Sequence, residues 1–429
     1  MLAVAVAVAA CGGRGGLRLT GRDGGQGAVG VPTGGAGGET ASGLGGSGGG
    51  AGGSSGSSGS GGAGDGGSAG TAGIAGNQDG AHCLPLTIGT QPVAIASQQA
   101  SPWAIATDGE NVFWVNVGKN NSVGKMVGYP PWGDGQVVKY AIDGCDNSPS
   151  VLASGRAHFY DATPTSGLAT DGTNVYWSDA GDALSVATGL SAQLLKCSVG
   201  GCENAPLAIG AFDAWAIAVN SNSIYWTTND PNSSEGPVFT CPSVGCDSTP
   251  TALWSSGMSP GSGIALDANN VYWSTTFEVM KCPLGGCGGS PTVLVSSAAG
   301  LTNLGAIALD ADNIYFIGTN YNDALSRILV CAKTGCADMP TTLATAIDPI
   351  TPFVAIVTDG TSVYWTTSSS KSVTGQVYKC RVSGCAKTLE VIASGLNHPG
   401  GIAVDARNLY WTDLATSSDD GKIWAVAKN

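Results

Sequence analysis

Cysteines are the residues of this chain whose spacing most clearly predicts chemistry. Five pairs share the spacing Cys-x4-Cys, and each has Gly directly before its second cysteine: Cys197/Cys202, Cys241/Cys246, Cys282/Cys287, Cys331/Cys336 and Cys380/Cys385. Each pair lies between two strand-like runs, so a Gly-containing turn would bring its thiols within reach of a disulfide. Zinc is the alternative, but each pair offers two thiolates and no repeated His completes a tetrahedral site. We expect five disulfides and no metal.

A further cysteine, Cys11, ends the apolar run of residues 1–11. The last four residues of this run, Val-Ala-Ala-Cys, resemble a bacterial lipobox, in which small residues precede a cysteine that becomes acylated. The alternative is a stray apolar N-terminus on a cytosolic protein, and the expected disulfides argue against it. We therefore expect a signal remnant over 1–11 and a lipid on Cys11. The domain would lie in the cell envelope, anchored to the outer membrane or cell surface, with the lipid as its only contact with the membrane.

Residues for acid–base chemistry are few and show no catalytic spacing. The histidines are His82, His158 and His398, and the loop carboxylates that could replace them are Asp161, Asp230, Glu235 and Asp323. The chain has no Gly-Lys-Ser phosphate loop, no G-x-S-x-G elbow and no H-E-x-x-H helix motif. We expect no catalytic residues and no cofactor, and catalysis is the minority hypothesis.

The elements that position these residues repeat along the chain. A phrase of an apolar triplet, Asp, two turn residues, Asn and an apolar-Tyr-Trp run occurs seven times, most clearly at residues 264–273. Its closing aromatic recurs at gaps of 63, 49, 47, 43, 49 and 46 residues: Trp114, Trp177, Trp226, Trp273, Phe316, Trp365 and Trp411. This period is that of a four-stranded propeller blade. The sequence predicts an all-β, seven-bladed β-propeller.

The ends of the array predict how the ring closes. The last copy stops after its third strand, residues 422–426, and an unpaired strand of the missing type, residues 92–96, precedes the first copy. An N-terminal strand that completes the last blade would protect the exposed edges. In this arrangement Cys83 takes the place of the last blade's second cysteine, opposite Val426, and Cys145 is the second cysteine of the first blade, opposite Tyr140. We expect a disulfide between Cys83 and Cys145 across the seam.

The repeated polar and aromatic residues are interpreted as structural. The acids of the phrase begin two- or three-residue turns, where an Asx side chain bonds backbone amides: Asp108, Asp171, Asp267, Asp310, Asp359 and Asp405. A ring of metal ligands is the alternative for these acids. The Tyr-Trp pairs are expected to pack between blades, with a stacking platform for sugars as the alternative.

One aromatic strand carries a recognisable motif. Residues 410–413, Tyr-Trp-Thr-Asp, match the signature of YWTD propellers of the lipoprotein-receptor type, and residues 176–179, 225–228 and 364–367 are near matches. Residues 113–116 and 315–318 are degraded copies. The whole folded segment therefore resembles this family, which implies a propeller, although that family has six blades and seven copies are counted here. The cysteine hairpins are foreign to the family.

Composition divides the chain into a tether and a domain. Residues 12–80 are nearly all Gly, Ser and Ala, with little to bury, so we expect a disordered linker. Residues 83–429 form the propeller and hold about 12 of the 13 net negative charges. Such a charge repels phosphate, so we expect no nucleic-acid partner.

Function is expected on the face formed by the second-to-third and fourth-to-first connections, because these differ among copies. Candidate ligand-binding residues on it are Tyr129, Trp132, His158, Tyr160, Asp161, Trp215, Tyr321 and His398. Exposed aromatics beside polar groups suit a protein or carbohydrate ligand, although the same loops could fold back as a lid over the ring. We expect a monomeric, surface-anchored binding or scaffold module. The alternative is a metal-dependent propeller lyase or lactonase that acts at the central axis.

Overall fold

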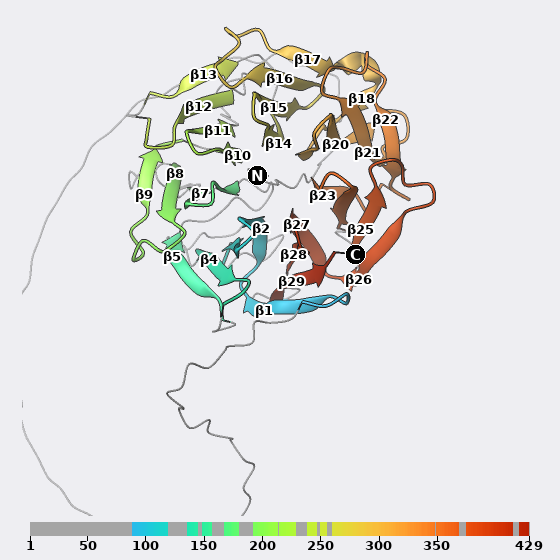
Figure 1. Cartoon of the computed structure of the whole chain (residues 1–429). Coiled ribbons are helices and arrows are strands. Elements are labelled where there is room, and N and C mark those ends of the chain that lie inside the picture. Colours follow the sequence, from blue (N-terminus) through green and yellow to red (C-terminus); the bar gives the residue numbers. More distant parts are fainter. Residues whose placement is uncertain are drawn as a thin grey trace, which may run out of the picture. The chain divides into compact units, whose positions relative to one another are not determined.

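The computed structural model describes residues 88–118, 135–144, 148–156, 167–179, 192–212, 214–228, 238–246, 249–254, 260–347, 349–368, 375–414 and 420–428. The signal-like segment and the Gly/Ser-rich segment lie outside the described residues, as do Cys11, Cys83 and Cys145. In the described part, seven antiparallel sheets surround one axis (Figure 1). The predicted seven-bladed β-propeller is therefore confirmed.

Each blade has four strands from the axis outward, and the inner strand of blade 5 is split in two. The strands are β2 (Pro102–Thr107), β3 (Asn111–Asn116), β4 (Gly135–Ala141) and β5 (Ser150–Arg156) in blade 1; β6 (Leu168–Thr170), β7 (Asn174–Asp179), β8 (Gln193–Ser198) and β9 (Leu207–Gly210) in blade 2; β10 (Ala216–Val219), β11 (Ser223–Thr227), β12 (Val238–Pro242) and β13 (Thr251–Trp254) in blade 3; β14 (Pro260–Leu266), β15 (Asn270–Thr275), β16 (Val279–Pro283) and β17 (Thr292–Val295) in blade 4; β18 (Leu301–Thr302), β19 (Ile307–Leu309), β20 (Asn313–Asn320), β21 (Ser326–Ala332) and β22 (Thr341–Thr345) in blade 5; β23 (Phe353–Thr358), β24 (Ser362–Thr367), β25 (Gly375–Arg381) and β26 (Glu390–Leu396) in blade 6; and β27 (His398–Val404), β28 (Asn408–Leu414), β29 (Gly421–Ala427) and β1 (Val93–Gln99) in blade 7. A short 3₁₀ helix, η1 (Ser297–Ala299), connects blades 4 and 5.

The ring closes at the strand predicted from the sequence. β1, at the N-terminal end of the domain, pairs antiparallel with β29 at its C-terminal end, with Val93 opposite Ala425 (Figure 1). The side chain of Gln99 adds a polar link across this seam, because its Oε1 accepts bonds from Trp114 Nε1 at 3.0 Å and Asn116 Nδ2 at 2.9 Å. The first and last parts of the domain thus share one blade.

The register bears on one detail of the seam. In each of the five disulfide blades, the residue before the first cysteine pairs with a residue of the fourth strand. The second cysteine lies five residues before that fourth-strand residue. Lys379 pairs with Glu390, for example, and Cys385 lies 390 − 385 = 5 residues earlier. In blade 7 the corresponding pair is Ala425 and Val93, so the same count leads to Ile88. Cys83 lies outside the described residues, so its position and its disulfide with Cys145 stay predictions.

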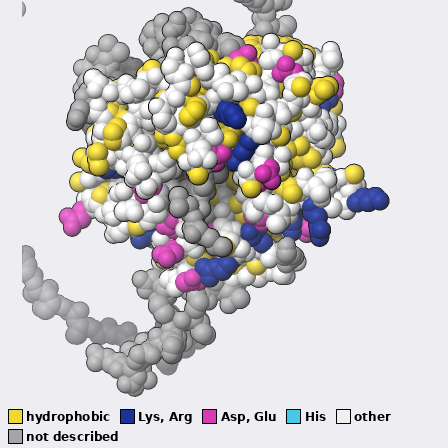
Figure 2. Space-filling view, turned by 45° about the horizontal axis from the view of Figure 1, so that its top comes forward, with side chains coloured by type: hydrophobic (Ala, Val, Ile, Leu, Met, Phe, Trp, Pro, Cys, Tyr) yellow, Lys and Arg dark blue, Asp and Glu magenta, His cyan; other side chains and the backbone are white. Residues whose placement is uncertain are grey.

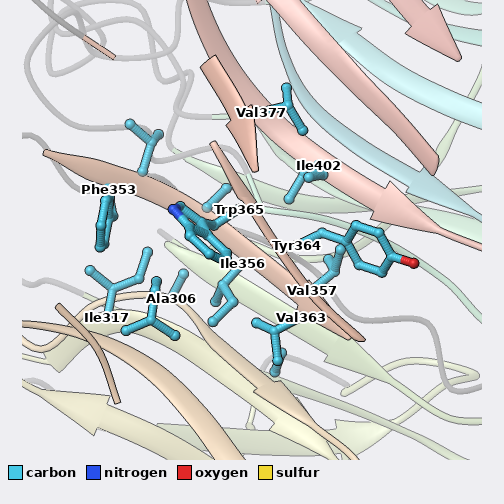
Figure 3. Close-up of a cluster of buried hydrophobic side chains, with 14 of the residues drawn as sticks. Ala306, Ile317, Phe353, Ile356, Val357, Val363, Tyr364, Trp365, Val377 and Ile402 are labelled. Atoms are coloured by element: carbon cyan, nitrogen blue, oxygen red, sulfur yellow. The ribbon is translucent and has the colours of Figure 1, made fainter. Parts of the chain in front are cut away.

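Aromatic pairs fill the spaces between blades. Adjacent residues of a strand point to opposite faces, and in Figure 3 Tyr364 and Trp365 of β24 do so. Trp365 lies with Ala306 and Ile317 of blade 5, while Tyr364 faces blade 7, beside Leu409. The other blades repeat this division, so each tryptophan, or Phe316 in blade 5, packs on the preceding blade. The repeated Tyr-Trp pairs are buried packing residues, as expected, and none is an exposed sugar platform.

The acids of the repeat hold turns, also as expected. Asp267 Oδ1 accepts the amides of Asn269 at 2.9 Å and Asn270 at 2.8 Å, and its Oδ2 accepts the Tyr272 hydroxyl at 2.8 Å. The same tyrosine-to-aspartate bond forms in blades 2, 5, 6 and 7. Because turn amides and a tyrosine bond these carboxylates, the acids serve as turn caps.

Hydroxyl groups after the tryptophan connect neighbouring blades near the axis. Ser274 Oγ accepts a bond from Gly263 N in its own blade at 3.1 Å and donates to Gly305 O in the next at 2.9 Å. Thr366 and Thr412 donate to the next blade in the same way, at 2.9 Å each. The inner strands approach so closely that a Cβ on Gly263 would lie 2.3 Å from the Gly305 oxygen, so only glycine fits there.

All five predicted disulfides are present: Cys197–Cys202, Cys241–Cys246, Cys282–Cys287, Cys331–Cys336 and Cys380–Cys385. The glycine before each second cysteine has a positive φ, 112° at Gly335 for example, which explains its recurrence. The disulfides also contact the preceding blade, since Cys336 Sγ lies 3.8 Å from Leu294 O. Such oxidised pairs are consistent with an extracytoplasmic location.

The surface in Figure 2 carries apolar side chains scattered singly or in small groups among many uncharged polar atoms. Scattered apolar residues are ordinary on a folded domain, whereas a large continuous patch would indicate a partner. Among the described residues, no helix has the length and apolar character needed to cross a bilayer.

Candidate functional site

The turns of the propeller lie on two opposite faces. The turns between first and second strands and the disulfide turns lie on one face, which we call the cysteine-turn face. In each of the five disulfide blades a backbone hydrogen bond joins the two turns, such as Leu284 N to Asn269 O at 2.9 Å. The second-to-third and fourth-to-first connections therefore lie on the other face, here the loop face. This is the face on which sequence variation predicts function.

Most predicted site residues lie outside the described residues. Tyr129, Trp132, His158, Tyr160 and Asp161 do so, as do the loop carboxylates Asp230 and Glu235. The described candidates, Trp215, Tyr321 and His398, come from blades 3, 5 and 7. No two of these blades are adjacent in the ring. Each candidate is therefore considered with its own neighbours.

Trp215 precedes the inner strand of blade 3 and is half-buried. Its amide donates to Thr227 O at 2.7 Å, which extends the pairing of β10 with β11 toward the loop face. Trp103 has the corresponding position in blade 1. Ile217 follows Trp215 by two residues and pairs with Trp226, and Ile105 follows Trp103 by two residues and pairs with Trp114. These indoles lie where the inner strands reach the loop face, and Trp103 also packs against the core on both sides.

Tyr321 forms an exposed aromatic pair with a residue that sequence reasoning missed. Its ring lies on that of Phe277, with centroids 6.4 Å apart and planes at 12°. Tyr321 is 61% exposed, whereas Phe277 is half-buried. The two rings come from the second-to-third loops of adjacent blades, 4 and 5. Phe277 has no repeated spacing, so only the pairing of these loops in space reveals it.

The loop that carries Phe277 is held by its own bonds. Thr275 Oγ1 accepts the amides of Phe277 at 3.2 Å and Glu278 at 2.9 Å, and Thr275 N donates to Glu278 O at 2.7 Å. Burial raises the pKa of the Glu278 carboxyl, and the charge on Asp338 acts in the same direction. The half-buried ring therefore stands on a four-residue turn with little freedom, next to a carboxyl that is a weaker acid than usual.

The loop that carries Tyr321 is equally constrained. Tyr321 N donates to Gly300 O at 3.3 Å, and Asn320 Oδ1 accepts the amide of Asn322 at 2.8 Å. Asp323 forms an ion pair with Arg327, and hydrogen bonding from that guanidinium lowers the pKa of the carboxyl to about 2. The hairpin that carries the Tyr321 ring thus also carries side-chain amide groups and a charged pair.

His398 lies beside a buried carboxyl in blade 7. Its backbone amide donates to Asp413 Oδ1 at 3.1 Å, and Asp413 is 8% exposed. Burial raises the pKa of Asp413, although the amides of His398 and Asn397 and the charge on His398 oppose this. This bond comes from the backbone of His398 and not from its imidazole. In the described ranges, no three His, Cys, Asp or Glu side chains form a group that could hold a metal ion.

A shallow pocket of about 190 Å³ lies on the other side of the molecule, between blades 6 and 7. It is lined by Tyr364, Lys379, Ile392, Val426 and Lys428, among others. Ile392 in the fourth strand of blade 6 corresponds to Leu294 in the fourth strand of blade 4. Leu294 is covered by the disulfide of the next blade, because Cys336 Sγ of blade 5 lies next to its carbonyl oxygen. Among the described residues, blade 7 has no disulfide turn to cover Ile392, and this leaves the pocket open. We therefore interpret the pocket as a result of how the ring closes and not as a binding site.

Comparison with known proteins gives only remote likenesses to solved structures. No protein-family model and no curated sequence matches this chain. Among solved structures, the β-propeller domain of the Trilobed protease from Pyrococcus furiosus is 10% identical, with a TM-score of 0.49 over 77% of this chain and 97% of that one. An oligogalacturonate lyase in complex with manganese is 9% identical, with a TM-score of 0.49 over 80% and 99%. The PQQ-bound aldose sugar dehydrogenase from Streptomyces coelicolor is 10% identical, with a TM-score of 0.43 over 80% and 100%. These likenesses are too remote to indicate an activity.

Proposed function

We propose that this protein is an extracytoplasmic binding module that recognises a protein or carbohydrate ligand through the loop face of its propeller. The observation that carries this proposal is the exposed pair of Phe277 and Tyr321, which two constrained loops present to solvent. An exposed aromatic side chain held in one orientation loses little entropy on binding and is a common centre of recognition.

The positions of the chain ends support this orientation. Ala427 N donates to Gly89 O at 2.8 Å, and Lys428 N donates to Arg407 O at 2.9 Å, in an aspartate turn. Both ends of the described domain therefore lie on the cysteine-turn face. The polypeptide thus enters and leaves the described domain on the face opposite the loop face.

The anchor itself is part of the proposal. We propose that Cys11 is acylated, that residues 12–80 are a flexible tether, and that the protein is held at the outer membrane or cell surface. Replacing Cys11 by Ser should move the protein from the membrane fraction to the soluble fraction of fractionated cells. Membrane association that survives this change would rule out the lipid anchor.

We also propose that the domain is related to YWTD propellers. The motif at Tyr410–Trp411–Thr412–Asp413 has a distinct structural role at each of its first three positions. Tyr410 bonds Asp405 at 2.8 Å, Trp411 is buried, and Thr412 reaches the next blade. These roles concern folding, so the resemblance supports the architecture and leaves the ligand open.

Crosslinking from defined positions tests which face binds. A photoactivatable phenylalanine analogue replaces Tyr321 on the loop face or Val244, which is 80% exposed on the cysteine-turn face, and intact cells from the source organism supply the ligand. We expect adducts that unlabelled protein suppresses from position 321 and none from position 244. Equal or greater crosslinking from position 244 would contradict the proposal.

A further inference from the structure

The strand that leads to Tyr321, β20, is the longest of the described second strands, and it is braced on both sides. β20 has 8 residues, and its last two pair with β18 on one side, Thr319 opposite Thr302 and Asn320 opposite Leu301. On the other side Thr319 pairs with Ser326 of β21. Tyr321 therefore follows directly from a braced three-stranded edge, so its ring is positioned before any ligand arrives.

The Phe277 ring lies next to this ring, with centroids 6.4 Å apart and planes at 12°. Tyr321 is nevertheless 61% exposed, so most of its side chain is open to solvent. A flat, exposed aromatic face is complementary to a ligand that presents a flat array of C–H groups. The C–H face of a pyranose ring has this shape, and its hydroxyl groups extend from its edge.

Polar groups around the ring suit those hydroxyls. Asn320, Asn322 and Asp323 lie within two positions of Tyr321, and Asn322 and Asp323 are exposed. Together with Arg327 they provide both donors and acceptors, which a sugar hydroxyl needs because it both donates and accepts. The nearby acids, Asp323 and Glu278, make an anionic saccharide unfavourable.

The size of the apolar surface favours a sugar over a protein. A stable protein interface covers about 800 Å² on each partner and has an apolar centre. Among the described residues around Tyr321, the apolar area consists of one exposed ring and one half-buried ring, with polar side chains next to them in the sequence. Two exposed aliphatic residues described on this face, Ile347 and Ile350, follow the fourth strand of blade 5 and not its Tyr321 hairpin.

We infer that Tyr321, supported by Phe277, binds one pyranose ring of a neutral oligosaccharide by stacking. This inference deepens the proposed function by naming the ligand class and the residue that holds it. Loop-face recognition of a protein would remain open if it failed.

Calorimetric titration of the whole purified chain with cellohexaose, mannohexaose and chitohexaose tests the inference, with hexagalacturonate as an anionic comparison. We expect at least one neutral probe to bind with a millimolar or lower Kd and hexagalacturonate to bind more weakly. Tyr321→Ala should weaken binding by at least about tenfold, whereas Tyr321→Phe should stay within about threefold, because stacking needs the ring and not the hydroxyl. Saturation transfer from aromatic protons should reach the ring C–H protons of the bound sugar.

Three results would overturn the inference. One is the absence of binding by every neutral probe at 10 mM, roughly the weak limit of useful recognition. Another is a Tyr321→Ala variant, shown to be folded by its circular dichroism, that binds as tightly as the natural protein. The last is loss of binding in Ile347→Ser with Tyr321→Ala unaffected, which would assign the contact to a different part of the loop face.

Discussion

Replacing Asp267 tests whether the acids of the repeat connect blades as well as hold turns. Its Oδ2 accepts Lys333 Nζ of blade 5 at 3.1 Å, in addition to the Tyr272 hydroxyl, and the two charged side chains are 23% and 12% exposed. Burial acts to raise the pKa of Asp267, but its amide, tyrosine and lysine partners outweigh it and lower the pKa from 3.8 to about 2. That lowering corresponds to about 2 kcal/mol of stability at neutral pH.

Two substitutions separate the parts of this interaction. Asp267→Asn keeps an oxygen for the turn amides, as Asn220 does naturally in blade 3 at 2.9 Å to the amides of Asn222 and Ser223, but it loses the ion pair. We expect a loss of about 1–2 kcal/mol in the free energy of unfolding. Asp267→Ala also leaves the Tyr272 hydroxyl and the two turn amides, of Asn269 and Asn270, without their acceptor, and we expect a loss of about 3 kcal/mol.

The assay is equilibrium urea unfolding followed by tryptophan fluorescence, with the disulfides kept oxidised. Asp171→Asn is the matched control, because Asp171 holds the same turn and accepts the Tyr176 hydroxyl at 2.8 Å, with no lysine bond among the described residues. It should lose less than about 1 kcal/mol. A lowered carboxyl pKa stabilises the fold above about pH 4 and ceases to do so as the pH falls toward 2. The difference between natural protein and Asp267→Asn should therefore shrink over that range. Equal losses in Asp267→Asn and Asp267→Ala, or a difference that does not change with pH, would refute this reasoning.

Further predictions concern the seam and the loop face. Replacing Cys83 and Cys145 by Ser should lower the melting temperature by several degrees if they form the seam disulfide, and an unchanged value would show that they do not. Gln99→Ala should cost about 1–2 kcal/mol in urea unfolding, because the indole of Trp114 then loses its acceptor, whereas Gln99→Glu should retain most of the stability. Burial raises the pKa of Asp413, so its ionisation opposes folding as the pH rises. Asp413→Asn should therefore gain stability relative to the natural protein between pH 4 and pH 7, as measured by urea unfolding, and a relative loss would contradict the shift.

The sequence predicted the parts of the fold that repeat, because repetition makes weak local signals visible. The seven aromatic strands, the Asp turns and the disulfides each recur, and each has the predicted structural role. Closure by β1 was also predictable, since one strand was missing at one end and one was unpaired at the other. The position of Ile88 was not, because it depends on the register of β1 against β29. A motif that occurs once at a seam has no second copy to calibrate it.

The candidate site was less predictable, since its residues do not repeat. Tyr321 was chosen as a loop aromatic, but its partner Phe277 lies 44 residues earlier in a different blade, as 321 − 277 gives. No sequence spacing identifies such a pair. It requires the turn at Thr275 and the hairpin that carries Tyr321 to face one another, and both depend on contacts between blades 4 and 5.

One of the two degraded copies of the motif, in blade 5, is also the copy that carries the candidate site. Blade 5 has Phe316 in place of tryptophan, Ile317 in place of the bridging hydroxyl residue, and then Gly318. A Cβ on Gly318 would lie 2.8 Å from Leu304 and 3.0 Å from Leu329, so a side chain there would displace both leucines. The inner strand of this blade is split in two, and its first part, β18, pairs with the end of β20 directly before Tyr321. A copy in which the YWTD signal is weak is therefore also the copy whose second strand is extended and leads to Tyr321. A search for function in such a repeat should include its degraded copies.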